Sequence, residues 1–245
     1  MNIFIFSGTT EGRELSLRLQ KMGHQVTVSV ATGYGKAAQG PGPVRILEGR
    51  MQEDEMERAL SGFDLCIDAT HPYAEAAGRN IRKAAGAAGV PYLRLQREES
   101  PIPENAVTVR NAKEAADYLS GREGRILLTT GSKELSAFAE IARERLIVRI
   151  LPSLQSLEEA LTADIPPANI IAMEGPFSEA FNELLIREKK ISFLVTKDGG
   201  RPGGFPEKAE ACRACGTTMV LIRRPEGREG DSMETILQKI EEGSV

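Results

Sequence analysis

The 245-residue chain has few of the side chains that most often carry enzyme chemistry, because it has two His, three Cys and no Trp. Two His leave little room for a His-rich metal site, so no protein-bound metal is expected. Three Cys cannot make a disulfide framework, which favours a reducing, cytoplasmic environment. A formal charge of −4 argues against a general binder of nucleic acid or of anionic membranes, although it permits local basic pockets.

The sequence also lacks any run that approaches the roughly 20 apolar residues of a transmembrane helix. The apolar residues 2–6 follow no basic segment and end at Ser7-Gly8, so they are predicted to form a buried first strand rather than a signal peptide. With these classes excluded, chemistry is expected from backbone groups, carboxylates, Lys, Tyr or a bound cofactor.

Cys212 and Cys215 lie three residues apart, late in a predicted helix rather than at its N-terminus, where a thiol pKa would be lowered. No second pair of cysteines accompanies them, and Cys66 and both His are distant in the sequence. The pair is therefore interpreted as buried and structural, with a zinc or redox site as the alternative.

What the sequence does contain is a repeated alternation of short β-rich runs and amphipathic helical stretches, which is typical of βαβ units and a parallel sheet. Strands are predicted at 2–6, 25–30, 44–47, 64–67, 92–95, 125–130, 146–150, 169–173, 191–196 and 218–222. Helices are predicted at 11–22, 52–60, 73–88, 111–119, 133–139, 178–188, 205–214 and 231–242.

This number of strands exceeds what one small doubly wound sheet usually holds. Charged residues, Ser and two Pro interrupt the pattern near residues 96–105. We therefore predict the α/β class, with two Rossmann-like lobes (residues 1–103 and 104–245), parallel sheets, and a cofactor and substrate cleft between the lobes.

The loop after the first predicted strand is the strongest local signal. Gly8-Thr9-Thr10-Glu11-Gly12 lies between a strand and a helix, so backbone amides and the helix N-terminus are aimed at an anion such as a pyrophosphate. Glycine lets the backbone approach such a group closely. The segment is not a full GxGxxG motif, since Thr10 stands at its second glycine, and the alternative is a tight turn with a Thr cap.

The second predicted strand runs into Ala31-Thr32-Gly33, without the Asp or Glu that usually holds the ribose diol of NAD. This argues against a standard NAD site and leaves NADPH open, with Arg13 or a later basic residue near the extra phosphate.

Three further side chains are candidates for proton transfer. His71 and Tyr73 follow the fourth predicted strand, and Pro72 between them fits the first turn of the next helix. His71 is equally compatible with a structural role, and Tyr73 either supplies a hydroxyl or covers the core. Lys197, before Gly199 and Gly200, holds a carboxylate or donates a proton, or else is a solvated surface residue.

In their order and spacing these loops resemble the precorrin-6A reductase and cobalt-precorrin-6A reductase family of cobalamin biosynthesis. Each matching segment is short, but together they span nearly the whole chain. The segments are 8–15, 68–74, 130–133, 149–152, 175–178, 196–200 with Gly203, Gly204 and Lys208, and 224–225. One departure is Asp198-Gly199-Gly200, where the family has a Ser hydroxyl before the last Gly.

The resemblance implies an oxidoreductase that uses NADPH or NADH to reduce one double bond of the precorrin-6A or cobalt-precorrin-6A macrocycle, giving the corresponding precorrin-6B. Any cobalt would belong to the substrate, a highly carboxylated tetrapyrrole. No nucleic-acid or membrane partner is expected, and the chain is expected to be a monomer or homodimer.

Site residues are assigned from the same resemblance combined with the loop positions. The cofactor is expected to contact Gly8, Thr9, Thr10, Glu11, Gly12, Arg13, Thr32, Gly33, Thr70, Gly131, Ser132, Gly175 and Phe177. Substrate carboxylates are expected to bind Lys133, Arg149, Arg201 and Lys208. The proton is expected from His71, Tyr73, Lys197 or water.

Two other classes are the alternatives. A methyltransferase that uses S-adenosylmethionine on tetrapyrroles also has a Gly-rich first loop, but it usually has an acidic residue at the end of the second strand. A non-catalytic nucleotide sensor would bind the cofactor without hydride transfer.

Overall fold

The computed structural model describes residues 1–40, 44–96, 100–224 and 230–245. The chain forms two compact units, called unit 1 (Met1–Glu98 with Pro225–Val245) and unit 2 (Glu99–Arg224). Each unit contains one sheet in which all paired strands run parallel. The predicted α/β class with two Rossmann-like lobes is thus confirmed. Within the described ranges, no helix is long and apolar enough to cross a membrane.

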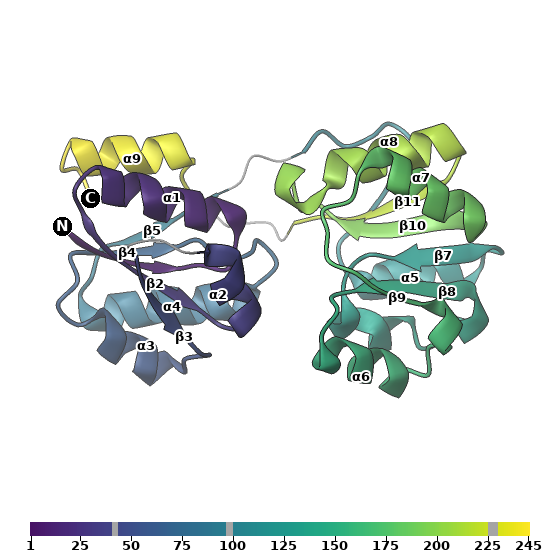
Figure 1. The fold of residues 1–245 in the computed structure, drawn as a ribbon, viewed down its shortest axis with the longest axis horizontal. Coiled ribbons are helices and arrows are strands. Elements are labelled where there is room, and N and C mark those ends of the chain that lie inside the picture. The colour runs from purple at the N-terminus through teal and green to yellow at the C-terminus, as the bar shows by residue number, and fades with distance from the viewer. Residues whose placement is uncertain (41–43, 97–99, 225–229) are drawn as a thin grey trace. The chain divides into compact units, whose positions relative to one another are not determined.

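Unit 1 is built on a five-stranded sheet in the order β3-β2-β1-β4-β5, with helices on both faces (Figure 1). Its elements are β1 (Asn2–Phe6), α1 (Thr10–Lys21), β2 (Gln25–Val30), α2 (Gly33–Gln39), β3 (Arg45–Glu48), α3 (Glu53–Leu60), β4 (Leu65–Asp68), α4 (Glu75–Ala88), β5 (Tyr92–Arg94) and α9 (Met233–Glu241).

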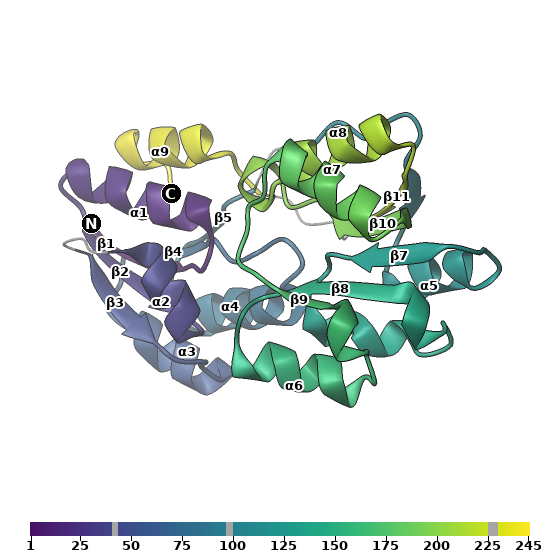
Figure 2. The ribbon, with the colours of Figure 1, turned by 45° about the vertical axis from the view of Figure 1, so that its right-hand side comes forward.

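The central strand β1 shows why this sheet needs two helical layers. Ile3 and Ile5 are buried on one face in a cluster with Leu15 of α1, and Phe4 is buried in a second cluster on the other face. A parallel sheet covered on both faces has strands that are apolar throughout rather than alternating. Ile236 of the C-terminal helix α9 belongs to the first cluster, and α9 lies beside α1 in Figures 1 and 2.

Unit 2 is built on a six-stranded sheet in the order β6-β11-β10-β7-β8-β9, with α7 and α8 on one face and α5 and α6 on the other (Figure 2). Its elements are β6 (Val107–Val109), α5 (Ala112–Ser120), β7 (Arg125–Leu128), η1 (Ser132–Phe138), η2 (Arg143–Arg145), β8 (Leu146–Ile150), α6 (Leu154–Thr162), η3 (Pro167–Asn169), β9 (Ile170–Ala172), α7 (Glu179–Glu188), β10 (Ile191–Lys197), η4 (Arg201–Gly203), α8 (Phe205–Cys215) and β11 (Thr218–Ile222).

The two sheets share one topology. In each, the chain moves outward from a first central strand (β1 or β7) through two neighbours, then crosses to the other side of that strand (β4 or β10). The strand order therefore reverses between β1 and β4, and again between β7 and β10. Ligands of open α/β sheets bind at such switch points, beyond the carboxyl ends of the strands.

The predicted lobe boundaries differ from the observed division at the C-terminal end, since residues 225–245 belong to unit 1 rather than to the second lobe. The backbone shows this directly, because Leu95 at the end of β5 forms a parallel bridge with Asp231. The amphipathic face of α9 is also buried against α1, as Ile240 is buried in the same cluster as Leu15. An amphipathic sequence pattern predicts that a terminal helix packs against a core, but it does not predict which of the two units supplies that core.

Several predicted elements also differ from the structure. Residues 33–39, for which no helix was predicted, form α2; α6 and the short strand β6 were not predicted either. Residues 132–138 form a 3₁₀ helix rather than an α-helix. The helix predicted from residue 73 begins at Glu75, because the Ala74 amide donates to the His71 carbonyl in a turn that contains Pro72.

Candidate functional site

The loops after β1 and β4 meet at the switch point of unit 1, and Thr9 joins them. Its hydroxyl caps α1 by accepting from the Gly12 amide at 3.0 Å and donates to the Ala69 carbonyl at 2.9 Å. One side chain thus fixes the start of α1 relative to the end of β4. A cap of this kind typically stabilises a helix by about 1 kcal/mol. Thr10 and Glu11, both predicted to contact the cofactor, lie in the first turn of α1.

Two glycines in this turn have different physical roles. Gly8 has a φ of 122°, which L side chains rarely adopt, and no atom lies within 4 Å of where its Cβ would be. A Cβ on Gly12 would lie 2.3 Å from Ser7 Oγ and 3.0 Å from Ala69 Cβ. Gly8 therefore permits the turn, and Gly12 lets α1 approach β1 and β4 closely.

The hydroxyl of Ser7 is buried in this turn and has no hydrogen-bond partner in the described part of the chain. An unsatisfied buried hydroxyl costs free energy, about 1–3 kcal/mol from mutational data. Its position beside Gly12 at the N-terminus of an α-helix is where a backbone turn binds an anion. The predicted Gly8–Gly12 loop therefore gains a buried hydroxyl from Ser7, the residue that precedes it. The sequence pattern gave Ser7 no role.

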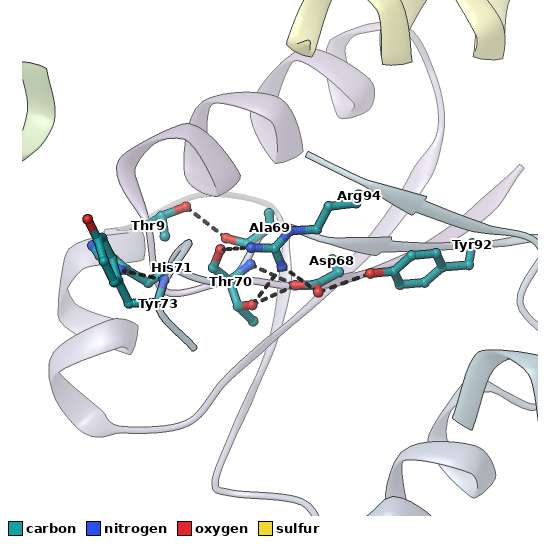
Figure 3. A network of polar contacts seen from close by, with 8 residues as sticks. All are labelled: Thr9, Asp68, Ala69, Thr70, His71, Tyr73, Tyr92 and Arg94. Carbon is teal, nitrogen blue, oxygen red and sulfur yellow. Dashed lines mark hydrogen bonds and ion pairs between the residues drawn. The ribbon is translucent and has the colours of Figure 1, made fainter. Parts of the chain in front are cut away.

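A buried network fixes the end of β4 (Figure 3). Asp68 is fully buried and forms an ion pair with Arg94, which is 8% exposed. Asp68 Oδ1 accepts from the Thr70 amide at 2.9 Å and hydroxyl at 2.6 Å, and its Oδ2 accepts from the Tyr92 hydroxyl at 3.2 Å. Arg94 in turn donates to the hydroxyl and the carbonyl of Thr70, both at 2.9 Å. Thr70, predicted to contact the cofactor, thus has its hydroxyl engaged inside the protein.

The same network holds Tyr92 in its neutral form, because burial and then the Asp68 carboxylate raise the pKa of the Tyr92 hydroxyl. A phenol that stays protonated can keep donating to Asp68. The network therefore orients the loop that carries the next residues of the site.

That loop presents His71 and Tyr73, whose rings lie 5.6 Å apart between centroids (Figure 3). The Tyr73 amide donates to His71 Nδ1 at 3.4 Å, so the neutral imidazole carries its proton on Nε2. His71 is exposed and Tyr73 is half-buried. Both therefore lie at the carboxyl edge of the sheet, in the same unit as the Thr9 turn.

The loop after β2 carries Thr32 and Gly33. Thr32 caps α2 by accepting from the Gly35 amide at 3.1 Å. A Cβ on Gly33 would lie 3.1 Å from the Glu48 carboxylate at the end of β3, and Glu48 pairs with Lys36 at 3.1 Å. An acidic side chain therefore lies near the end of β2, although it comes from the neighbouring strand β3.

Arg13, predicted to contact the cofactor, makes a contact inside unit 1. Its Nε donates to the Gln39 carbonyl at 2.7 Å, at the C-terminal end of α2. The Gln39 amide donates to Ser16 of α1 at 2.8 Å, so this contact joins α1 to α2. A basic side chain that binds a last helical carbonyl stabilises the helix end. Arg13 therefore has a structural contact that explains its presence.

In unit 2 the loops after β7 and β10 meet at the second switch point. Gly131 and Ser132 follow β7, and Gly131, with a φ of 88°, precedes η1 without a side-chain cap. Lys197 at the end of β10 forms an ion pair with Glu134 of η1 at 2.7 Å. Glu134 Oε2 and the Thr130 hydroxyl are buried without hydrogen-bond partners among the described residues. Lys197 is therefore held at the switch point, and not solvated at the surface.

A second group of predicted residues lies on the α7 and α8 face of unit 2. Phe177 lies with its ring centroid 4.3 Å from the Arg149 guanidinium, and its ring also packs against Gly175. Lys208 is buried at the start of α8. By contrast, Lys133 and Arg201 are exposed. The structure thus separates the four predicted substrate-binding cations into two buried and two exposed ones.

The structure also shows where Cys212 and the loop at Asp198 lie. Cys212 of α8 is buried in the core cluster of unit 2, and burial raises the pKa of its thiol to about 12. No cluster of three or more His, Cys, Asp or Glu with metal-binding geometry occurs in the described ranges. The loop that departs from the family pattern holds Asp198, which pairs with Arg224 at 2.8 Å and accepts from the Ser100 hydroxyl at 2.7 Å.

Sequence reasoning gave no role to several residues that build these sites: Ser7, Glu48, Asp68, Tyr92, Arg94, Glu134 and Asn182. One signal could have found Asp68 and Arg94, because each is a charged residue that ends an otherwise apolar strand. Glu134 and Asn182 lie in helices with ordinary polar composition, so their roles depend on tertiary contacts alone.

Comparison with known proteins supports one family. A family model described as precorrin-6x reductase CbiJ/CobK matches residues 2–241 of this chain. A cobalt-precorrin-6A reductase of Priestia megaterium is 32% identical over 240 residues, covering 95% of this chain and 94% of that protein. A cobalt-precorrin-6A reductase of Methanothermobacter thermautotrophicus is 34% identical, covering 95% of this chain and 80% of that protein.

Further matches bear related names. A precorrin-6A reductase of Rhodococcus erythropolis is 34% identical, covering 91% of this chain and 89% of that protein. A solved structure described as CobK precorrin-6A reductase superposes with a TM-score of 0.80 at 23% identity, covering 99% of this chain and 96% of that chain. The last comparison shows that the two chains have the same fold.

Proposed function

The chain belongs to the precorrin-6x reductase CbiJ/CobK family, and we propose that it transfers a hydride from a reduced nicotinamide cofactor to one double bond of the precorrin-6A macrocycle. Membership confirms the family resemblance of the strand-end loops, and with it an oxidoreductase of cobalamin biosynthesis. The observation that carries the proposal is the turn between β1 and α1, where the buried Ser7 hydroxyl lies at a helix N-terminus beside the switch point.

The residues of this turn fit a dinucleotide pyrophosphate. Ser7 offers a buried hydroxyl with no partner among the described residues, and the space beside Gly8 is clear of other atoms within 4 Å. Gly12 keeps the N-terminus of α1 close against the sheet, where its positive end favours an anion. When bound, the reduced nicotinamide supplies the hydride, and the conjugated macrocycle accepts the electron pair.

The proposal extends to NADH as the preferred form of the cofactor. Glu48 lies beside Gly33 at the carboxyl ends of β2 and β3. Its Oε2 pairs with the exposed Lys36, whereas its Oε1, on the side of Gly33, can accept hydrogen bonds from a ribose diol and disfavours a 2′-phosphate there. The Nε of Arg13, the residue expected to bind that phosphate, already donates to the Gln39 carbonyl. Glu48→Gln should weaken NADH binding severalfold and narrow the preference over NADPH.

Reduction of the double bond also requires a proton at a neighbouring carbon. His71 and Tyr73 lie at the carboxyl edge of unit 1, and Lys197 lies at the corresponding edge of unit 2, held by Glu134. General acids of this kind contribute about 10²–10⁴ in rate. We therefore assign proton donation to one of these three residues. The variants His71→Asn, Tyr73→Phe and Lys197→Met test them one at a time. The donor is the residue whose replacement lowers kcat and leaves cofactor binding unchanged.

The test of the proposed function uses the purified chain. Because the chain has no Trp, binding of NADH and NADPH is followed by direct excitation of the reduced nicotinamide rather than by energy transfer. Oxidation of the cofactor is then measured with cobalt-precorrin-6A and with metal-free precorrin-6A, which also decides the metal state of the substrate. Binding without oxidation in the presence of either macrocycle would favour a nucleotide sensor, and absence of binding would contradict the proposal.

A further inference from the structure

Two buried cations lie on the α7 and α8 face of unit 2. Arg149, on β8, is 9% exposed, and Lys208, in the first turns of α8, is 7% exposed. They are close enough for the charge of Arg149 to lower the pKa of Lys208 in addition to the effect of burial. Side chains of this type are almost never so deeply buried without a counter-ion.

The hydrogen bonds of the two cations are to neutral groups. Arg149 donates to the side-chain oxygen of Asn182 at 2.8 Å and lies over the ring of Phe177. Lys208 donates to the Gly203 carbonyl at 2.9 Å. Within residues 100–224, no carboxylate lies at ion-pair distance from either cation. Several N–H groups of the pair are therefore available for an anion.

The charged groups around Lys208 do not replace a counter-ion. Arg149 lowers its pKa, whereas Glu207 and Cys212 on the same helix and Asp198 in the preceding loop raise it. Asp198 is already engaged by Arg224 and by the Ser100 hydroxyl. Glu207 is adjacent to Lys208 on α8, where consecutive side chains point in different directions. Burial remains the largest effect and lowers the pKa of Lys208 to about 8 and that of Arg149 to about 10.

A fold that keeps two such charges without compensation bears a desolvation cost, since buried charges are normally paired. Unit 1 shows the normal solution, because its buried Arg94 is paired with Asp68. The uncompensated pair in unit 2 is what a site for an anionic ligand requires, because the ligand supplies the missing negative charge. Asn182 and Phe177 hold the guanidinium in one orientation, which favours a planar, bidentate anion.

We infer that Arg149 and Lys208 form a binding site for one carboxylate side chain of the macrocycle, with Asn182 and Phe177 as positioning residues. This inference rests on the proposed function for the identity of the ligand. A carboxylate is favoured over a cofactor phosphate because the pyrophosphate has its own turn in unit 1, at Ser7 and Gly8. Lys133 and Arg201 are exposed and solvated, so a bound carboxylate gains less from them.

The test compares Arg149→Gln and Lys208→Met with a matched control. Arg125→Gln is the control, because Arg125 also donates to an asparagine oxygen, that of Asn169 at 3.0 Å, but from the amino end of β7. Binding of cobalt-precorrin-6A and of metal-free precorrin-6A is followed by their visible absorbance without cofactor, and KM and kcat are then measured with NADH. Each site variant should weaken macrocycle binding and raise KM by about tenfold or more, as expected for a charge-assisted hydrogen bond.

The cofactor and the melting temperature give independent readouts. NADH affinity should be unchanged in both site variants, and Lys208→Met should not lower the melting temperature, because it removes a buried charge that lacks a counter-ion among residues 100–224. Arg149→Lys, which retains the charge, should recover part of the lost affinity. Arg125→Gln should leave macrocycle binding and KM at wild-type values.

Each other outcome has a defined meaning. Unchanged macrocycle affinity together with a lower melting temperature would show a structural role and overturn the inference. Weaker NADH binding would assign the anion to the cofactor and overturn it as well. If the wild type binds the macrocycle but does not oxidise NADH, the proposed function fails, while the binding comparison still supports or overturns the carboxylate site. If no form of the macrocycle binds, both fail.

Discussion

Units 1 and 2 use the same scaffold for different purposes. Both place a buried Asp at the end of the fourth strand of the shared topology and pair it with an Arg near the end of the fifth, as Asp68 with Arg94 and Asp198 with Arg224. In both, a glycine with positive φ comes after the first strand, Gly8 or Gly131. The feature that the two units share is therefore the buried Asp–Arg pair with its positive-φ glycine, which holds the loops at the carboxyl edge of the sheet.

The units differ in the helix that comes after this glycine. In unit 1 the glycine leads into the 12-residue helix α1, which Thr9 caps. In unit 2 it leads into the 3₁₀ helix η1, which has no side-chain cap. A 3₁₀ segment gives a short and poorly aligned set of backbone dipoles, so it is a weaker anion site than an α-helix. Unit 2 has instead two buried cations, Arg149 and Lys208. The same topology therefore carries a capped α-helix N-terminus in unit 1, which we propose binds the pyrophosphate, and a pair of buried cations in unit 2.

The largest expected effect concerns the paired Asp and Arg. Arg94→Met leaves Asp68 fully buried without its cation and should lower the free energy of unfolding by about 3–5 kcal/mol. Arg224→Met should have a similar but smaller effect, because Asp198 keeps the amide and hydroxyl of Ser100. Urea unfolding curves of each variant measure both losses.

A surface variant serves as the control for this comparison. Arg79→Met breaks an exposed ion pair with Glu75 and should change stability by less than about 0.5 kcal/mol. The double variant Asp68→Asn with Arg94→Met should recover part of the loss, since no unpaired charge remains. An Arg94→Met loss as small as that of Arg79→Met would show that unit 1 is not stabilised by its buried pair.

The next largest effect distinguishes the two first turns. Gly12→Ala places a Cβ against Ser7 and Ala69 and should push the start of α1 away from the sheet. Overpacking of this kind lowers stability by about 1–3 kcal/mol. Because it also displaces the helix N-terminus proposed to bind the pyrophosphate, NADH affinity should fall by about tenfold or more. Fluorescence titration of the bound cofactor measures the change.

Gly131→Ala is the matched variant in unit 2. No atom lies within 4 Å of where the Gly131 Cβ would be, so the cost is limited to its positive φ, and NADH affinity should stay unchanged. A similar loss in both variants would bring Gly131 into the cofactor site, as the sequence pattern predicts, and would remove the functional difference between the turns.

These contrasts also show how much the sequence can predict. The alternation of strands and helices predicted both sheets, because a buried parallel strand is a short apolar run that any composition scan detects. The Gly8–Gly12 turn was found for the same reason, as its signal is local. Glu48 and Glu134 were not found, because each contacts a residue of a different element: Glu48 lies beside Gly33 of α2, and Glu134 pairs with Lys197 of β10. The return of α9 to unit 1 likewise depends on a tertiary contact, the cluster that contains Leu15.

A smaller effect concerns the pH dependence of unit 2. Because burial lowers the pKa of Lys208 to about 8, the folded protein loses this proton as the pH rises above that value, and KM for the macrocycle should increase by up to about tenfold per pH unit. The unfolded chain holds the proton more tightly, so the destabilising contribution of this group, present at low pH, should fade between about pH 8 and about pH 10.

Lys208→Met should abolish both pH-dependent changes, whereas the exposed Lys133→Met should retain them. Steady-state kinetics and urea midpoints, measured for the three proteins over this pH range, give the comparison. A wild-type KM that does not change with pH would show that the ammonium does not contact the bound substrate.

The smallest expected effect concerns the cap that α1 has and η1 lacks. Thr9→Val keeps the shape of the side chain but removes its bonds to the Gly12 amide and the Ala69 carbonyl, so stability should fall by about 1 kcal/mol. Ser132→Ala, at the start of η1, removes no cap and should have almost no effect. If Thr9→Val also weakens NADH binding while Thr32→Val, which removes only the cap of α2, does not, the bond from Thr9 to Ala69 has a role beyond capping. It then holds the two loops of the switch point in the arrangement that the cofactor needs.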